Sequence, residues 1–290
     1  MKHRINPQID CVFKAILGSE SNKPLLISFL NSVIKPSSPI VLVDILNPYN
    51  EKEFIGDKLS IVDIKAQDDQ KRLFQIEIQM AIFPHLPARM LYTWSDIYAA
   101  QLQDGEKYND LHPVISIWLL VENLFTATAV AHHHFQMADL VQQKILNDHC
   151  SLHVLELNKW QTAPTLSIED QWMLFFREAK SWSELPAQLD TPELRQAMAT
   201  LQRFSEKEKA YHLYQARENA IREEKTQQSL LEEALAKQEE ERIAKEAERS
   251  AKEAERSAKE AERSAKEAAI LEQERLRELL RKAGINPDAP

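Results

Sequence analysis

Residues 57–79, DKLSIVDIKAQDDQKRLFQIEIQ, decide the fold of the first half of this chain. Apolar and polar residues alternate along residues 59–65 and again along residues 74–79. Alternation with a period of two is typical of a strand with one buried face. Residues 66–71 between the runs are short and charged, as in a turn. The stretch therefore predicts an antiparallel hairpin.

The same alternation places reactive side chains on shared faces. Asp63 and Lys65 lie on one face of the first strand, and Glu77 and Gln79 lie on one face of the second. If the two faces coincide, two carboxylates meet, and a divalent cation with oxygen ligands relieves their repulsion. The alternative is an ordinary solvated polar face, which is common on antiparallel hairpins. The pattern alone leaves both interpretations open.

The composition fits a cytoplasmic globular protein with much helix. The chain has 290 residues, 43% of them hydrophobic, and only 4 glycines. Its 2 cysteines, Cys11 and Cys150, show neither a disulfide framework nor metal-ligand spacing, so we expect a reducing cytosol. The first residues lack the apolar segment of a secretory signal, and no apolar run is long enough to cross a bilayer.

The charge argues modestly against tight nonspecific DNA binding. The formal net charge is -9, and no segment forms a basic arm. Because phosphate neutralisation supplies much of the affinity for DNA, such binding needs a local basic patch. The candidates for this patch are Lys58, Lys65, Lys71, Arg72 and Arg89.

The elements around the hairpin predict a mixed α/β core. Two helices precede it, and a helix with a period near 3.6 follows it. The apolar runs before and after these elements predict a central strand and a strand buried on both faces. In chain order we predict helices at 10–17 and 25–33, a strand at 40–46, a turn at 47–57, the hairpin, a helix at 86–102 stopped by Gly105, and a strand at 114–121.

Three adjacent histidines, His132 to His134, lie in a predicted strand at 131–135. Neighbours in a strand face opposite sides, so the three cannot all bind one ion. His149, Cys150 and His153 lack the further ligands that would complete a metal cluster. We therefore interpret these residues as structural.

The second half of the chain is predicted to be mainly helical. Ser167 with Asp170, and Thr191 before Pro192, are typical helix starts. The heptad KEAERSA then repeats at 245–251, 252–258 and 259–265, with alanines spaced four and three apart. This seam fits a coiled-coil dimer, which implies a homo-oligomer, and equally a single charged helix that acts as a spacer. Four regions follow: a core at 1–125, a mixed then helical region at 126–235, the heptad helix at 236–283 and a tail at 284–290.

A set of short motifs in this order resembles the recombination-promoting nuclease (Rpn) family, also labelled PD-(D/E)XK nuclease family transposase. The motifs span roughly residues 5–125, and only their combination is specific. They are Asp10-x-x-Phe13-Lys14, Asp63-Ile-Lys65 with Asp68, Glu77-Ile-Gln79, Arg89 leading into Tyr92, Tyr98-x-x-Gln101 and Gly105-x-x-Tyr108.

The resemblance implies a restriction-endonuclease-like α/β core with a mixed sheet, followed by helices, and a Mg²⁺-dependent endonuclease that cuts DNA and promotes recombination. Asp63, Glu77 and the carbonyl of Ile78 would hold the divalent cation. Gln79 stands where the general nuclease pattern has lysine, as is usual in this family, and an amide cannot supply positive charge to the transition state. Lys65 or Lys14 would supply it instead.

The nuclease hypothesis assigns further roles to residues of this chain. Gln79 would orient the attacking water, and Asp10 would complete an outer shell around the site. Lys58, Lys71, Arg72 and Arg89 would bind DNA. The competing hypothesis is a catalytically degenerate core that binds DNA or acts as a scaffold, with oligomerisation through the C-terminal helices.

Overall fold

The computed structural model describes residues 3–46, 63–161 and 165–282. These residues belong to two compact units, the first ending at Arg222 and the second beginning at Glu223. Among the described residues no helix is both long enough and apolar enough to cross a membrane.

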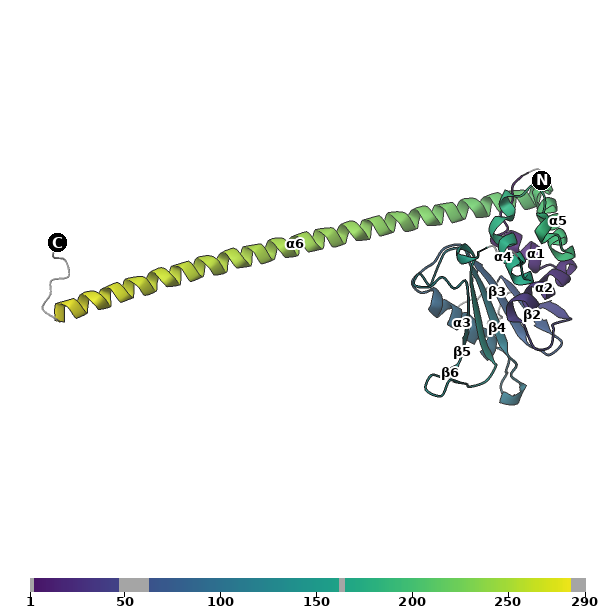
Figure 1. Ribbon diagram of the computed structural model, residues 1–290, viewed down its shortest axis with the longest axis horizontal. Helices are drawn as coiled ribbons and strands as arrows, with labels where there is room; N and C mark the ends of the chain where they lie inside the picture. The colour runs from purple at the N-terminus through teal and green to yellow at the C-terminus, as the bar shows by residue number, and fades with distance from the viewer. Residues whose placement is uncertain (1–2, 47–62, 162–164, 283–290) are drawn as a thin grey trace. The chain divides into compact units, whose positions relative to one another are not determined.

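A mixed six-stranded sheet forms the centre of the first unit (Figure 1). The first two strand pairs are antiparallel, the next two are parallel, and the last pair is antiparallel. A separate two-stranded ribbon consists of β6 (Ala138–Asp139) and β7 (Lys144–Ile145). In spatial order the sheet contains β1 (Val43–Leu46), β2 (Ile64–Asp68), β3 (Leu73–Gln79), β4 (Val114–Leu120), β8 (Cys150–Glu156) and β5 (His132–Gln136).

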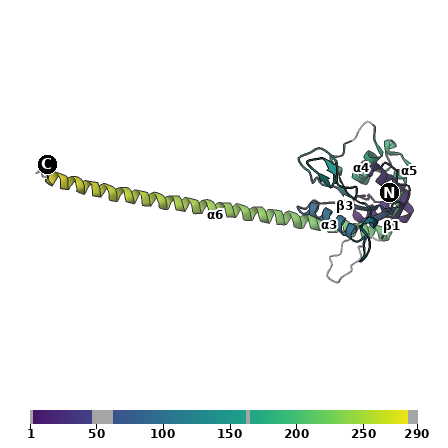
Figure 2. The same cartoon turned by 90° about the horizontal axis from the view of Figure 1, so that it is seen from below.

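Helices cover both faces of this sheet (Figures 1 and 2). One face packs against α1 (Asp10–Leu17), α2 (Lys23–Ile34), α4 (Ile168–Glu178) and α5 (Pro192–Glu206). The other face packs against α3 (Leu86–Ala99) through Met90 and Trp118. Short 3-10 helices lie at η1 (Glu20–Asn22), η2 (Tyr108–Asp110), η3 (Leu157–Lys159), η4 (Ala179–Ser181) and η5 (Ala187–Leu189).

The predicted hairpin is present, with a shorter turn than expected. Strand β2 continues through the predicted turn to Asp68, whose carboxylate accepts hydrogen bonds from the backbone N–H groups of Gln70 and Arg72. Arg72 Nε also lies 2.6 Å from Asp68 Oδ2, and Lys71 adopts a positive φ of 61°. The buried carboxylate thus stabilises a tight reversal after Asp68. The predicted first part of the strand, residues 59–62, and the predicted turn at 47–57 lie outside the described residues.

The strand predicted at 40–46 is shorter than predicted and does not lie at the centre of the sheet. It begins at Val43 and is an edge strand, not a central one. Ile40 and Val43 are buried, whereas Val41 is 72% exposed, and residues 40–42 precede the strand. The apolar run gave the strand its conformation, but its position depends on which partners pair with it.

The other elements near the hairpin agree with the sequence prediction. The helices at 10–17 and 25–33 are α1 and α2, and β4 is buried along its whole length. Helix α3 ends at Ala99, before the predicted limit at 102, and Leu91 on this helix is 58% exposed.

Strand β8 was not predicted. It lies parallel to β4 and is buried throughout, although Ser151, His153 and Glu156 interrupt its apolar pattern. The strand expected at 131–135 is β5, which pairs with β8 at the other edge of the sheet. The predicted core boundary at residue 125 therefore falls between strands of one sheet.

The predicted helix starts are confirmed in the second half of the chain. Ser167 and Asp170 form a reciprocal capping box at α4, and the Thr191 side chain caps α5. Helix α6 (Glu208–Lys282) begins in the first unit and continues through the described part of the second.

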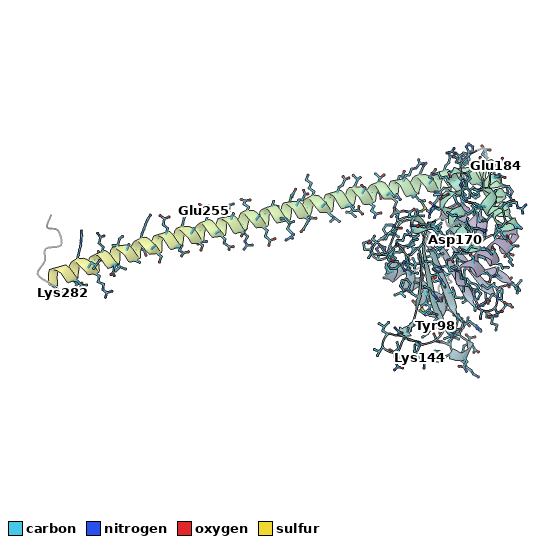
Figure 3. All side chains as sticks on the ribbon, in the orientation of Figure 1. Tyr98, Lys144, Asp170, Glu184, Glu255 and Lys282 are labelled. Atoms are coloured by element: carbon cyan, nitrogen blue, oxygen red, sulfur yellow. The ribbon has the colours of Figure 1, made fainter. Side chains whose placement is uncertain are left out.

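The repeat region of α6 is a charged helix. Within the repeats, Glu248 and Lys252, and likewise Glu255 and Lys259, form ion pairs four residues apart at 2.5 and 2.6 Å. Every described side chain from residue 229 to 279 is exposed, and side chains project from all sides of the helix (Figure 3). The coiled-coil and single-helix interpretations both fit this surface, and the predicted tail at 284–290 lies outside the described residues.

Candidate active site

The hairpin register brings Asp63 and Glu77 together. Ile64 pairs with Ile76, so Asp63, immediately before β2, lies opposite Glu77 on β3. The Asp63 N–H donates to Glu77 Oε1 at 3.3 Å, and the Ile78 N–H donates to Asp63 Oδ2 at 3.0 Å. The two acids on the arms of the hairpin are thus neighbours and do not splay to opposite sides of the sheet.

Glu77 lies in a strongly perturbed environment. Glu77 is only 4% exposed to solvent. Burial, the largest cause, and the negative charge of Asp63 together raise the pKa of Glu77 from 4.5 to about 8, against the opposing effect of Arg89. Without a cation, Glu77 therefore holds a proton at neutral pH. A bound cation would favour its ionised form, which is the behaviour expected of a metal ligand.

Two cations approach the acids from different helices. Lys14 of α1 places its Nζ 3.1 Å from Asp63 Oδ1. Arg89 of α3 lies with Nη1 3.5 Å from Gln79 Oε1 and with its guanidinium 5.7 Å from the Trp118 ring centroid. Of the two lysines proposed from the sequence, Lys14 is the one that contacts Asp63.

Lys65 shares the predicted strand face but lies farther along it. In the register of β2 and β3 it stands opposite Gln75. It lines a pocket of about 380 Å³ together with Lys71, Gln67, Gln101 and other residues of α3 and the following loop.

Two glutamines flank Glu77 on β3. Gln79 donates through Nε2 to the carbonyl of Ala81 at 3.0 Å. Gln75 was not identified as a site residue, yet its Nε2 lies 3.4 Å from Glu77 Oε1, and its own Oε1 accepts from the Ser116 hydroxyl at 3.0 Å. Trp118 Nε1 in turn donates to Ser116. The alternation of residues 75, 77 and 79 was the signal that could have identified Gln75.

The remaining candidate residues lie outside this cluster or serve the hairpin. Asp10 is bound by Arg217, whose Nε lies 2.9 Å from Asp10 Oδ2. Arg72 is paired with the buried Asp68 at the turn, where Lys71 also lies. Lys58 lies outside the described residues.

The two neighbouring carboxylates fit a divalent cation with oxygen ligands. The described residues contain no group of three or more His, Cys, Asp or Glu side chains that could hold a metal. Mg²⁺ is commonly held by one or two carboxylates and keeps several waters. Asp63 and Glu77 provide two neighbouring carboxylates of this kind, beside the backbone of Ile78.

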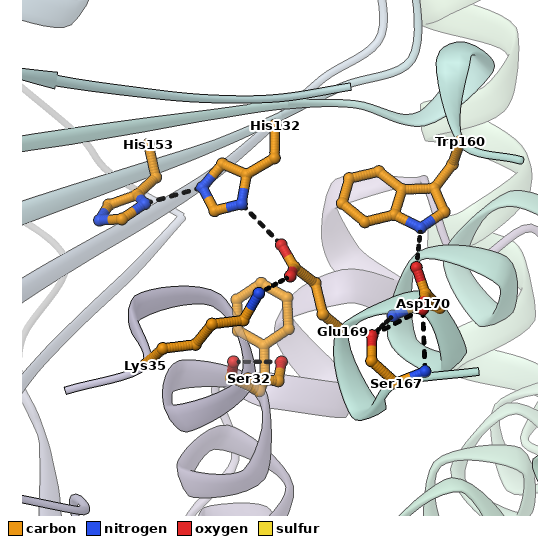
Figure 4. A network of polar contacts seen from close by, with 9 residues as sticks. Ser32, Lys35, His132, His153, Trp160, Ser167, Glu169 and Asp170 are labelled. Carbon is orange, nitrogen blue, oxygen red and sulfur yellow. Dashed lines mark hydrogen bonds and ion pairs between the residues drawn. The ribbon is translucent and has the colours of Figure 1, made fainter. Parts of the chain in front are cut away.

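The histidines form a separate polar network (Figure 4). His132 and His134 contact His153 on one face of the sheet, whereas His133 lies 3.3 Å from Glu156, so neighbouring histidines do face opposite sides. Glu169 lies 2.6 Å from both His132 Nδ1 and Lys35 Nζ.

The network joins β5, β8 and α4. His132 Nδ1 lies against Glu169, His132 Nε2 shares a hydrogen bond with His153 Nδ1, and His153 Nε2 shares one with the Ser151 hydroxyl. Burial, with smaller contributions from His134 and His132, lowers the pKa of His153 to about 3. The cluster therefore explains how polar residues are accommodated in β8.

The comparisons with known proteins agree with this geometry. No curated protein and no solved structure matches the chain. A family model described as PD-(D/E)XK nuclease family transposase matches residues 7–234, most of the 290-residue chain and all of the sheet that carries Asp63 and Glu77. The chain therefore belongs to the PD-(D/E)XK nuclease family transposases.

Proposed function

We propose that this protein is a divalent-metal-dependent DNA endonuclease that hydrolyses phosphodiester bonds and promotes recombination. Family membership supports a nuclease-type enzyme with DNA as its substrate. The single observation that carries the proposal is the pairing of Asp63 with Glu77, whose pKa is raised to about 8 by burial beside that acid.

We assign separate roles to the residues around Asp63 and Glu77. Asp63, Glu77 and the Ile78 carbonyl would hold the cation, for which Mg²⁺ is the natural choice. When bound, a divalent cation neutralises phosphate charge and acidifies water. Gln75 fixes the orientation of the Glu77 carboxylate through Ser116.

Positive charge in the site comes from side chains near the acids. The neutral amide of Gln79 cannot supply positive charge. Arg89 contacts Gln79, however, and Lys14 forms an ion pair with Asp63. We propose that Lys14 and Arg89 stabilise the charge that develops on the phosphate, with Lys65 as a further contributor from β2. Gln79 would orient the attacking water.

The DNA would follow the α3 face of the sheet. Arg89 and Lys71 lie on or beside that face, and Lys58 and Arg72 complete the set of basic residues proposed to contact phosphates. Because Arg72 is held by Asp68, its contribution is expected to be the smallest of the described ones.

Plasmid nicking tests the proposal. Purified protein should convert supercoiled plasmid to nicked or linear DNA with Mg²⁺ and not with EDTA. Asp63→Ala and Glu77→Ala should lower the rate at least a hundredfold, whereas Asp69→Ala, an exposed acid on the same hairpin, should not. An Asp63→Ala variant that cuts as fast as the parent would disprove the assignment.

A second candidate function is a scaffold or DNA-binding module without cleavage. The exposed apolar residues at the far end of α6, Leu271, Leu276 and Leu279, favour it, because a second helix could cover them. DNA binding without metal-dependent cutting, together with a C-terminally assembled oligomer, would support this function over the first.

A further inference from the structure

Within the first unit, the first turns of α6 contact the N-terminal segment and α1. Arg217 forms an ion pair with Asp10 at 2.9 Å. Beside it, the His3 ring stacks on Tyr211 with centroids 3.9 Å apart, and the Asn6 N–H lies 3.4 Å from the Tyr214 hydroxyl. Arg217 is therefore held at a defined place next to the start of α1.

Asp10 and Lys14 lie one turn apart on α1. An acid four residues before a lysine is the favourable order for an ion pair along a helix. Asp10 is therefore a natural partner for the Lys14 ammonium. In the structure both residues have other partners: Asp10 Oδ2 accepts from Arg217 Nε, and Lys14 Nζ lies 3.1 Å from Asp63 Oδ1.

The remaining oxygen of Asp10 is also engaged. Asp10 Oδ1 accepts the backbone N–H of Cys11 at 2.8 Å. One Asp10 oxygen bonds this N–H and the other bonds the Arg217 guanidinium, whose positive charge compensates the carboxylate and weakens its attraction for the Lys14 ammonium. If Arg217 were removed, one oxygen and a full negative charge would face the solvent one helical turn from Lys14.

We propose that Arg217 is a positioning residue for the site. Its ion pair with Asp10 prevents Asp10 from attracting Lys14, so the Lys14 ammonium stays paired with Asp63. Its consequence for cleavage rests on the proposed nuclease function, but the ion-pair exchange does not. Loss of Arg217 lets Asp10 compete for Lys14, which moves positive charge away from the two acids.

This exchange has a signature that general damage to the fold would not produce. An ammonium on Asp63 repels a metal ion held by the same carboxylate, so its withdrawal tightens Mg²⁺ binding. The same withdrawal removes charge that assists the phosphate, so cleavage slows. Arg217→Ala should therefore bind Mg²⁺ about threefold more tightly and nick plasmid about fivefold more slowly, the size expected for a partly exposed pair.

The experiment uses the full chain and measures Mg²⁺ affinity by calorimetry beside initial nicking rates. Arg222→Ala is the matched control, because it removes the same charge from α6 at a residue paired with Glu218. It should change neither quantity. In the Lys14→Gln and Asp10→Asn backgrounds, adding Arg217→Ala should have no further effect on Mg²⁺ affinity.

Three outcomes would overturn the inference: an Arg217→Ala variant equal to the parent, weaker Mg²⁺ binding in it, or the same change when Lys14 is already Gln. If the parent neither binds Mg²⁺ nor nicks DNA, the proposed function has failed instead. The inference is then decided by urea unfolding in EDTA, where the Arg217/Lys14 double-mutant cycle should deviate from additivity by about twofold in the unfolding constant. An additive cycle refutes it.

Discussion

Replacing Glu77 by Gln should stabilise the metal-free protein, and the gain should depend on pH. Glu77 is 4% exposed and its pKa is about 8 in the folded state, against 4.5 for an ordinary glutamate. Between these values the unfolded chain has released a proton that the folded chain still holds. Folding stability from this group is therefore complete below pH 4.5 and is lost as the pH rises through 8.

The magnitude follows from the size of the pKa difference. Each pKa unit corresponds to about 1.4 kcal/mol, so the rise from 4.5 to about 8 costs the parent up to about 5 kcal/mol of unfolding free energy at pH 9. Glutamine is neutral at every pH and has nearly the shape of a protonated glutamate. The variant should match the parent near pH 4.5 and exceed it increasingly up to pH 8 to 9.

Urea unfolding in EDTA at pH 5, 7 and 9 measures this difference, with exposed Glu184→Gln as the matched control. Millimolar Mg²⁺ should recover stability at pH 8 for the parent and much less for Glu77→Gln, because only the parent gains a carboxylate ligand. A stability difference that stays the same at all three pH values would refute the assigned protonation of Glu77.

Four further outcomes are expected. Asp68→Ala should lower the unfolding free energy by about 3 kcal/mol in urea titrations, because it leaves the Arg72 guanidinium without its buried partner. Glu156→Ala should cost about 3 to 5 kcal/mol, since its fully buried side chain caps two backbone N–H groups and pairs with a lysine. His153, with its pKa lowered to about 3 by burial, makes the parent lose stability as the pH falls below 6.5, and His153→Gln should reduce that slope in urea unfolding between pH 6.5 and 4.5. Sedimentation of a chain ending near Lys237 should show a smaller assembly than the full chain if α6 forms a coiled coil, and unchanged mass would leave α6 as a spacer.

Local patterns in the sequence were enough for much of the fold. Alternation along residues 59–79 predicted the hairpin, and the continuous apolar run at 114–121 predicted the buried strand β4. The capping residues Ser167 and Thr191 located helix starts correctly. These features depend on hydrogen bonds and side-chain periods within a few residues, so they can be read without knowing the partners.

The place of each strand in the sheet could not be obtained in this way. The apolar run before the hairpin formed an edge strand. Strand β8 was not predicted, because the polar residues Ser151, His153 and Glu156 interrupt the apolar pattern typical of a buried strand. Their polar groups are tolerated because partners from β5, the β4–β5 connection and η3 satisfy them. Sequence periodicity contains no information about such distant partners.

For the candidate site, the sequence by itself determined which residue types share a strand face: Asp63 with Lys65, and Glu77 with Gln75 and Gln79. Only the tertiary structure decided that Asp63 stands opposite Glu77 and that Lys14 rather than Lys65 contacts it. It also placed Arg217, 207 residues away in sequence, on Asp10. The physical reason is that strand alternation fixes direction, whereas distance between side chains depends on register and on how helices pack against the sheet.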